Sequence, residues 1–184
     1  MPHIEGHVPT EQPSDWVLRW APLVERGPLL DLACGGGRHA RLFAARGLEV
    51  VAVDRESQVF AENIEFVKAD LEDGSPWPFG GRRFAAIVVT NYLHRPLFPR
   101  IAESLQEGGV LIYETFMMGN EKYGRPSNPQ FLLRPGELLE AFGTLAVAGF
   151  EQGRVERPKQ AMIQRLCALR GAAEGIKLRI ESPA

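Results

Sequence analysis

Three consecutive glycines, Gly35 to Gly37, stand between an apolar run at 29–33 and a stretch with helical spacing at 38–46. A short apolar run bounded by glycines is typical of a buried strand, and Gly47 is placed to end the helix. Glycine lets the backbone turn tightly and lets a ligand approach the main chain, and a helix start presents free N–H groups. The pattern therefore predicts a strand–turn–helix unit with a ligand-binding turn.

Apolar runs and helical patterns keep alternating along the rest of the chain, which predicts a parallel sheet covered on both faces. The connection 151–161 lacks a helical pattern, so we expect a hairpin there and an antiparallel last strand. The expected fold class is α/β, a Rossmann-like doubly wound, mostly parallel seven-stranded sheet with helices on both faces. The expected strands are 29–33, 48–53, 64–68, 84–89, 110–115, 144–150 and 162–169, and the expected helices are 14–22, 38–46, 57–63, 99–106 and 135–142.

Length and charge exclude several classes of protein. A chain of 184 residues suits one domain, which we place at 14–184 after a flexible tail at 1–13. The net charge of −2 gives no overall basic footprint for nucleic acid. No apolar run is long enough for a membrane span, and the N-terminus lacks the layout of a signal peptide. Two distant cysteines, Cys34 and Cys167, are expected to be reduced, which favours a cytoplasmic protein.

The segment DLACGGG at 31–37 resembles the first motif of the class I S-adenosylmethionine-dependent methyltransferases. Asp54, after an apolar strand, matches the acid that holds the ribose hydroxyls in that family, and Asp70-Leu71 matches the position that contacts the adenine. The segment at 90–94 matches the part that faces the methyl donor and substrate. The resemblance covers about residues 14–170. In size and motif layout it is closest to small bacterial methyltransferases of the tellurite-resistance or thiopurine type.

This resemblance implies S-adenosylmethionine as the cofactor and no metal. Candidate catalytic residues are Tyr92, His94 and Glu114, near the carboxyl ends of two expected strands, where ligands gather in open α/β sheets. The cofactor-binding residues that the resemblance implies are Asp31, Ala33, Cys34, Gly35, Gly37, Asp54, Arg55, Asp70, Leu71 and Asn91.

Several candidates also have a structural interpretation. Asp31 can cap backbone N–H groups of the glycine turn, Cys34 can be a small packing residue, and Glu114 can be a buried carboxylate with a partner. Ala33 stands where many family members have glycine, which alanine tolerates if its φ is negative. His39, at the start of the second helix, is expected to be solvated.

The spacing Gly35-x-Gly37-x-x-Ala40 also matches the dinucleotide fingerprint, so a nicotinamide-dependent oxidoreductase is an alternative. Asp31 opposes it, because a carboxylate about 4 Å from a phosphate charge costs roughly 4 kcal/mol at an effective dielectric constant of about 20. S-adenosylmethionine has no phosphate, and its amino group and sulfonium are positive. A methyltransferase-like subunit that binds the cofactor without activity of its own is a further alternative.

We expect methyl transfer to a small-molecule acceptor by direct displacement, in which the protein aligns the acceptor and excludes water. The segment NYLH at 91–94 is not the Asn/Asp-Pro-Pro-Tyr tetrapeptide of amino-methylating nucleic-acid enzymes, which disfavours a nucleic-acid acceptor. The sequence leaves open whether O, N, S or a metalloid accepts the methyl group, whether a general base acts, and the oligomeric state. The stretch 116–134 is either a lid or acceptor pocket or an irregular surface loop.

Overall fold

The computed structural model describes residues 11–61 and 63–175. Seven strands in this part of the chain form one sheet, in the order β3-β2-β1-β4-β5-β7-β6. The strands are β1 (Leu29–Leu32), β2 (Val50–Asp54), β3 (Ile64–Lys68), β4 (Phe84–Thr90), β5 (Leu105–Phe116), β6 (Ala146–Val155) and β7 (Ala161–Leu169). The α-helices are α1 (Asp15–Trp20), α2 (Arg38–Ala44), α3 (Phe98–Glu103) and α4 (Glu137–Ala141), and single turns of 3₁₀-helix are η1 (Ala21–Leu23), η2 (Arg95–Leu97), η3 (Asn120–Lys122), η4 (Pro129–Phe131) and η5 (Ala173–Gly175).

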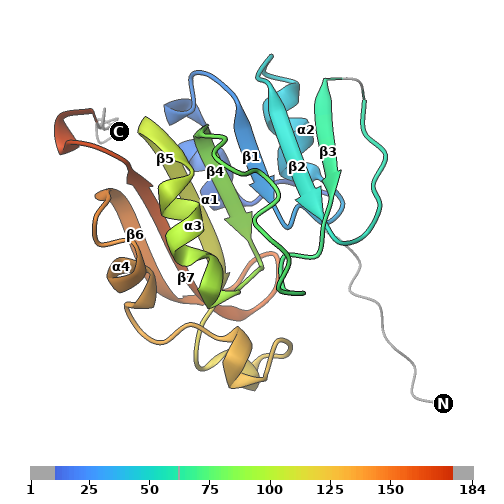
Figure 1. The fold of residues 1–184 in the computed structure, drawn as a ribbon. Helices are drawn as coiled ribbons and strands as arrows, with labels where there is room; N and C mark the ends of the chain where they lie inside the picture. Colours follow the sequence, from blue (N-terminus) through green and yellow to red (C-terminus); the bar gives the residue numbers. More distant parts are fainter. Residues whose placement is uncertain (1–10, 62, 176–184) are drawn as a thin grey trace, which may run out of the picture.

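Each face of the sheet buries its own core. Figure 1 shows α3 and α4 in front of the sheet and α1 and α2 behind it. Successive side chains of a strand point to opposite faces, so Leu30 and Leu32 of β1 join the core under α3 and α4, whereas Leu29 joins the core under α1 and α2. Apolar residues on both faces explain why the central strands are almost continuously hydrophobic.

Strand directions confirm the expected fold class. Strands β1 to β5 are parallel to one another, and β7 pairs antiparallel with both β5 and β6. The last strand is therefore the antiparallel one. The β6–β7 hairpin is longer than the sequence pattern suggested, because pairing continues from Ala146↔Leu169 to Val155↔Ala161.

The prediction of a short helix at 57–63 is wrong for the described residues, since 57–61 have no helical structure. A segment of this length is only marginally stable as a helix on its own. Here the ring of Phe60 packs instead against Phe66, with ring centroids 5.7 Å apart, and covers Gly37. Tertiary packing of one aromatic side chain therefore decides the conformation of this connection.

Most of the tail expected at 1–13 lies outside the described residues, and Ser14 is the N-cap of α1. Its hydroxyl accepts a hydrogen bond from the Trp16 N–H at 3.1 Å. Across residues 11–61 and 63–175, none of the helices has the length and apolar character that crossing a bilayer requires.

Candidate active site

A pocket of about 850 Å³ opens at the carboxyl ends of the parallel strands. Strand order reverses between β1 and β4, which is where open α/β sheets form their ligand-binding crevice. The segment between β5 and α4 lies at the same end of the sheet (Figure 1) and forms the outer wall. The lining residues are Ala33, Gly35, Asp54, Arg55, Glu56, Ala69, Asp70, Leu71, Glu72, Asn91, Tyr92, Leu93, Thr115, Phe116, Arg125, Pro126, Ser127, Asn128 and Phe131.

The glycine turn connects β1 to α2 through left-handed backbone. Gly35 has φ 52°, and Gly37, the N-cap of α2, has φ 75°. Ala33 has φ 53°, so the condition under which alanine replaces glycine without strain is not met. The Cys34 N–H donates to the Val53 carbonyl at 2.9 Å, which fixes the turn against β2. Because non-glycine residues rarely adopt positive φ, Ala33 is held in a strained conformation at the pocket wall.

Asp54 ends β2 with its carboxylate beside the glycine turn. Its Oδ2 accepts the Gly35 N–H at 2.8 Å, and its Oδ1 accepts the Glu56 N–H at 3.0 Å. Parallel pairing of β2 with β3 places Asp54 opposite Lys68, two residues before Asp70. These contacts place Asp54 between the glycine turn and the segment after β3, both of which line the pocket.

Asp31 lies below the glycine turn, away from the residues that line the pocket. Its side chain is 1% exposed, and its Oδ2 accepts the Ala40 N–H of α2 at 2.8 Å. Burial raises the pKa of Asp31 to about 7, and the hydrogen bond from Ala40 and the charge of Arg38 offset only part of that rise. Cys34 is also buried, which raises its thiol pKa, and neither Cys34 nor Gly37 lines the pocket.

His39 is buried at 1% exposure, so its expected solvation is wrong. Its Nε2 accepts the Ser14 N–H at 3.1 Å, which places the ring proton on Nδ1, 3.4 Å from the Thr90 Oγ1. Burial, with a smaller effect of the Arg38 charge, lowers the pKa of His39 to about 3. His39 is therefore a neutral link between the start of α1, α2 and the end of β4.

The inner wall beyond β3 and β4 brings Glu72, Asn91 and Tyr92 together. Asn91 has φ 55°, and its N–H donates to the Glu114 carbonyl at 2.9 Å. The Tyr92 Oη is buried without a hydrogen-bond partner among the described residues. Burial, followed by the charge of Glu72, raises the pKa of Tyr92, so its phenol stays protonated. His94 lies off the wall, with its Nδ1 3.9 Å from a Glu72 oxygen.

Glu114 also lies off the pocket wall, within a network that ties α1 to the antiparallel side of the sheet. One carboxylate oxygen accepts the Ser14 hydroxyl at 2.7 Å, and the other lies 3.2 Å from Arg165. Arg165 also pairs with Glu151 at 2.6 Å. These contacts match the structural interpretation of Glu114 as a carboxylate with a partner.

The outer wall is anchored by Arg95, which follows the Tyr92–His94 segment. Its guanidinium donates to Glu137 at 2.6 and 3.0 Å, and to the carbonyls of Gln130 and Leu132 at 2.8 and 2.9 Å. Burial raises the pKa of Glu137, but the bonds from Arg95 and from the Arg134 N–H outweigh it and leave the pKa below its usual value. The stretch 116–134 is therefore a pocket wall held by specific contacts.

The structure brings most of the expected site residues together on one wall. Sequence reasoning missed three charged residues of the pocket: Glu56, Glu72 and Arg125. Glu56 and Glu72 follow the expected acids by two residues, a position at strand ends that could have indicated them. Arg125 had no motif to mark it. The expected residues on the wall are Ala33, Gly35, Asp54, Arg55, Asp70, Leu71, Asn91 and Tyr92, and those off it are Asp31, Cys34, Gly37, His94 and Glu114.

Fold and pocket together define a doubly wound α/β domain with a pocket at its topological switch point. A model of the methyltransferase domain family matches residues 5–127. That match covers more than half of the chain, so the protein belongs to this family.

Known proteins agree with this membership. Trans-aconitate 2-methyltransferase of Methylobacterium nodulans is 32% identical over 110 residues, which are 54% of this chain and 42% of that protein. TehB of Haemophilus influenzae has a TM-score of 0.69 at 17% identity over 84% of this chain and 61% of its own. The Burkholderia thailandensis 1,6-didemethyltoxoflavin-N1-methyltransferase has a TM-score of 0.62 at 19% identity over 85% and 76%.

The resemblance to the class I methyltransferases is thereby confirmed. The chain spans about half the length of the curated relatives it matches, 49% of one and 42% of the other.

Proposed function

We propose that this protein is an S-adenosylmethionine-dependent methyltransferase that transfers a methyl group to a small-molecule acceptor. The observation that carries the proposal is the charge of the pocket beside the glycine turn. Four carboxylates, Asp54, Glu56, Asp70 and Glu72, line it against two guanidiniums. A wall with an excess of two negative charges attracts a ligand with a sulfonium and an ammonium group.

Pyrophosphate suits the same wall poorly. The Gly35 N–H, which would face a phosphate in a dinucleotide site, is already bonded to the Asp54 carboxylate. Two phosphate charges would add to the negative charge of the wall, and each close pair of like charges is unfavourable. The pocket therefore favours S-adenosylmethionine over a nicotinamide dinucleotide.

The residues of the pocket fit the parts of this cofactor. The motif resemblance assigns Asp54 to the ribose hydroxyls and Asp70-Leu71 to the adenine, and both positions line the pocket. The strained backbone of Ala33 and Asn91 puts main-chain atoms at the wall, a common feature of ligand sites. The Burkholderia relative was crystallised with bound 1,6-didemethyltoxoflavin and S-adenosylhomocysteine, which supports a small-molecule acceptor.

The protein's own contribution to the chemistry is alignment and exclusion of water. When bound, S-adenosylmethionine supplies an activated methyl group whose leaving group is a neutral thioether. Tyr92 lines the pocket with its hydroxyl buried and protonated beside Glu72, so its ring adds to the wall that excludes water. For an acceptor that still carries a proton, we propose a carboxylate of the pocket as the base, because Asp54, Glu56, Asp70 and Glu72 line it and His94 does not.

The cellular location that we propose is the cytoplasm. Cys34 and Cys167 are both free and buried, as expected for a protein in a reducing compartment.

The test replaces the ribose-binding carboxylate. Asp54→Asn should weaken S-adenosylhomocysteine binding by about 1.5–3 kcal/mol, the value of a hydrogen bond to a charged group. Asp73→Asn is the matched control, because Asp73 Oδ1 accepts the Ser75 N–H at 2.8 Å in the same i to i+2 arrangement but lies outside the pocket. Titration calorimetry measures both affinities, and circular dichroism checks the fold. Equal affinities in the two variants would remove Asp54 from the cofactor site.

A further inference from the structure

The two halves of the pocket differ in charge. The inner half, formed by the glycine turn and the segments after β2 and β3, holds all four carboxylates of the wall. The outer half comes from residues 115–131, at the end of β5 and after it, and Arg125 is its one charged residue among those that line the pocket. A ligand in the outer half therefore meets a positive charge.

Arg125 has no hydrogen bond or ion pair with any of the residues 11–61 and 63–175. The other arginines near this wall are engaged: Arg95 and Arg134 both pair with Glu137. An arginine presents five donors in a planar fork that matches a carboxylate. At the wall of a pocket, an unpaired guanidinium is available to a ligand.

Asn128 adds a second donor to the same wall. Its Oδ1 accepts the Gln130 N–H at 3.0 Å, which fixes the orientation of the side-chain amide. The NH₂ group has no further partner within the described residues, so what it can offer a ligand is a donor. The unused hydrogen-bonding capacity of these two side chains consists mostly of donors, which favours a ligand group that accepts hydrogen bonds.

Contacts at both ends hold this donor wall in place. The Asn120 Nδ2 donates to the Pro126 carbonyl at 3.0 Å, and Arg95 holds the Gln130 carbonyl at 2.8 Å. Phe116 and Phe131 line the pocket beside the donors, and Phe131 is 46% exposed. A wall whose backbone is held in place, and which carries two donors and two aromatic rings, fits a small molecule that has an anionic group and an apolar body.

We propose that the acceptor of this methyltransferase carries a carboxylate, which Arg125 and Asn128 bind while its apolar part lies against Phe116 and Phe131. This inference rests on the proposed function. A carboxylate suits the site better than a phosphate dianion, because the pocket as a whole has four carboxylates and two guanidiniums. Each further negative charge on the ligand adds repulsion from the inner half.

The test uses the full chain saturated with S-adenosylhomocysteine and three probes of similar shape: benzoate, benzamide and phenyl phosphate. Calorimetry or ligand-observed NMR gives their affinities. We expect benzoate to bind about tenfold or more tightly than benzamide. Arg125→Ala should reduce benzoate affinity by about ten- to hundredfold and leave benzamide unchanged. Arg157→Ala is the matched control, since Arg157 carries the same charge but does not line the pocket.

Arg125→Lys separates charge from geometry. It should retain part of the preference for benzoate, because an ammonium keeps the charge but not the fork. The inference is overturned if benzoate does not bind, if benzamide binds equally well, or if Arg125→Ala behaves like Arg157→Ala. Tighter binding of phenyl phosphate than of benzoate overturns the assignment to a carboxylate. Failure of S-adenosylhomocysteine itself to bind is a separate result, which contradicts the proposed function.

Discussion

At the scale of single residues, Asp31 shows how burial changes the role of a motif acid. The motif places a carboxylate at the end of β1, and the fold buries it at 1% exposure against the Ala40 N–H. Its pKa of about 7 means that the folded protein takes up a proton that the unfolded chain, with an ordinary pKa of 3.8, does not hold at neutral pH. Asp31 therefore links stability to pH.

The sign of this linkage gives a prediction for Asp31→Asn. Because the folded-state pKa is raised, the contribution of Asp31 to stability is fully present below the unfolded pKa of 3.8 and is lost as pH rises through about 7. The asparagine variant should therefore gain stability relative to the native protein between about pH 4.5 and about pH 8, by up to about 4 kcal/mol. Urea unfolding of both proteins at several pH values measures the difference in their free energies of unfolding. The contributions of other titrating groups, such as His39, are the same in both proteins and cancel in that difference. A difference independent of pH would contradict the raised pKa.

Residue-scale features were the least predictable from sequence. The glycine turn and the position of Asp54 followed from pattern and resemblance, because an apolar run, glycines and a helix start form a local signal. The positive φ of Ala33 did not follow from the sequence, because it depends on how the turn pairs with β2. The burial of His39 did not follow either, because it depends on a contact with Ser14, which lies in a distant segment. Arg125 reaches the pocket through a segment whose course no local pattern determines.

At the scale of elements, the clamp between η2 and α4 holds the outer wall. Glu137, 4% exposed, accepts two hydrogen bonds from Arg95 and one from the Arg134 N–H. Arg95 also binds two carbonyls of the 128–132 segment. One carboxylate at the start of a short helix thus determines where the wall lies relative to Tyr92.

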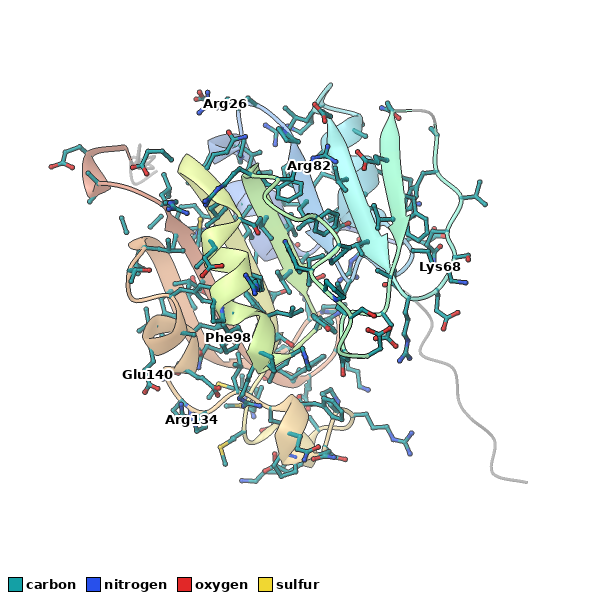
Figure 2. All side chains as sticks on the ribbon, viewed as in Figure 1. Arg26, Lys68, Arg82, Phe98, Arg134 and Glu140 are labelled. Atoms are coloured by element: carbon teal, nitrogen blue, oxygen red, sulfur yellow. The ribbon has the colours of Figure 1, made fainter. Side chains whose placement is uncertain are left out.

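Glu137→Gln should lower the free energy of unfolding by about 1–3 kcal/mol, because an amide loses the charge and one of the acceptors while the Arg95 donors stay partly buried. Glu140→Gln is the matched control in the same helix. Figure 2 shows Arg134 and Glu140 at the edge of α4, and their ion pair, with side chains 60% and 62% exposed, should contribute less than about 0.5 kcal/mol. Urea denaturation compares the two variants. Equal losses would show that Arg95 and Glu137 do not form a specific clamp.

Element prediction succeeded where periodicity is local and failed where packing decides. The strands that are apolar on both faces were predicted closely, because their pattern does not depend on partners. The segment 57–63 had a helical pattern, but Phe60 packs against Phe66 and Gly37 instead. For 116–134 the choice between a pocket wall and a surface loop depended on Arg95, which lies more than twenty residues earlier in the sequence.

At the scale of the whole molecule, α1 fastens the N-terminal part of the chain to the antiparallel side of the sheet. Trp20 packs on Gly149 of β6, and the Trp16 Nε1 donates to the Leu166 carbonyl at 3.3 Å. Ser14 reaches Glu114 near the pocket. The same helix therefore supports both the edge hairpin and the strand that leads into the outer wall.

Gly149→Ala tests this packing. A Cβ at Gly149 would lie 2.3 Å from the Trp20 ring, which is 8% exposed and held edge-on by Trp16. The substitution should lower the free energy of unfolding by about 1–3 kcal/mol, the usual cost of overpacking. Gly81→Ala is the control, because a Cβ there meets nothing within 4 Å. Thermal unfolding of the two variants measures the effect. A melting temperature of Gly149→Ala equal to that of Gly81→Ala would contradict the close packing of Trp20 on Gly149.

The overall topology was the most predictable level. Alternating strands and helices with short connections allow few parallel arrangements, and the missing helix between the last two strands indicated the antiparallel β7. The order of β6 and β7 at the edge of the sheet could not be predicted, because it depends on strand pairing along the whole hairpin and not on a short sequence pattern.

The proposed function depends on binding of S-adenosylmethionine in the pocket at the carboxyl ends of the strands. Titration calorimetry of the purified chain with S-adenosylhomocysteine, run beside NAD, tests it most directly. The four carboxylates and the Asp54–Gly35 contact predict binding of S-adenosylhomocysteine with a dissociation constant of about micromolar order and no measurable binding of NAD. Binding of NAD alone, or of neither ligand, would contradict the account.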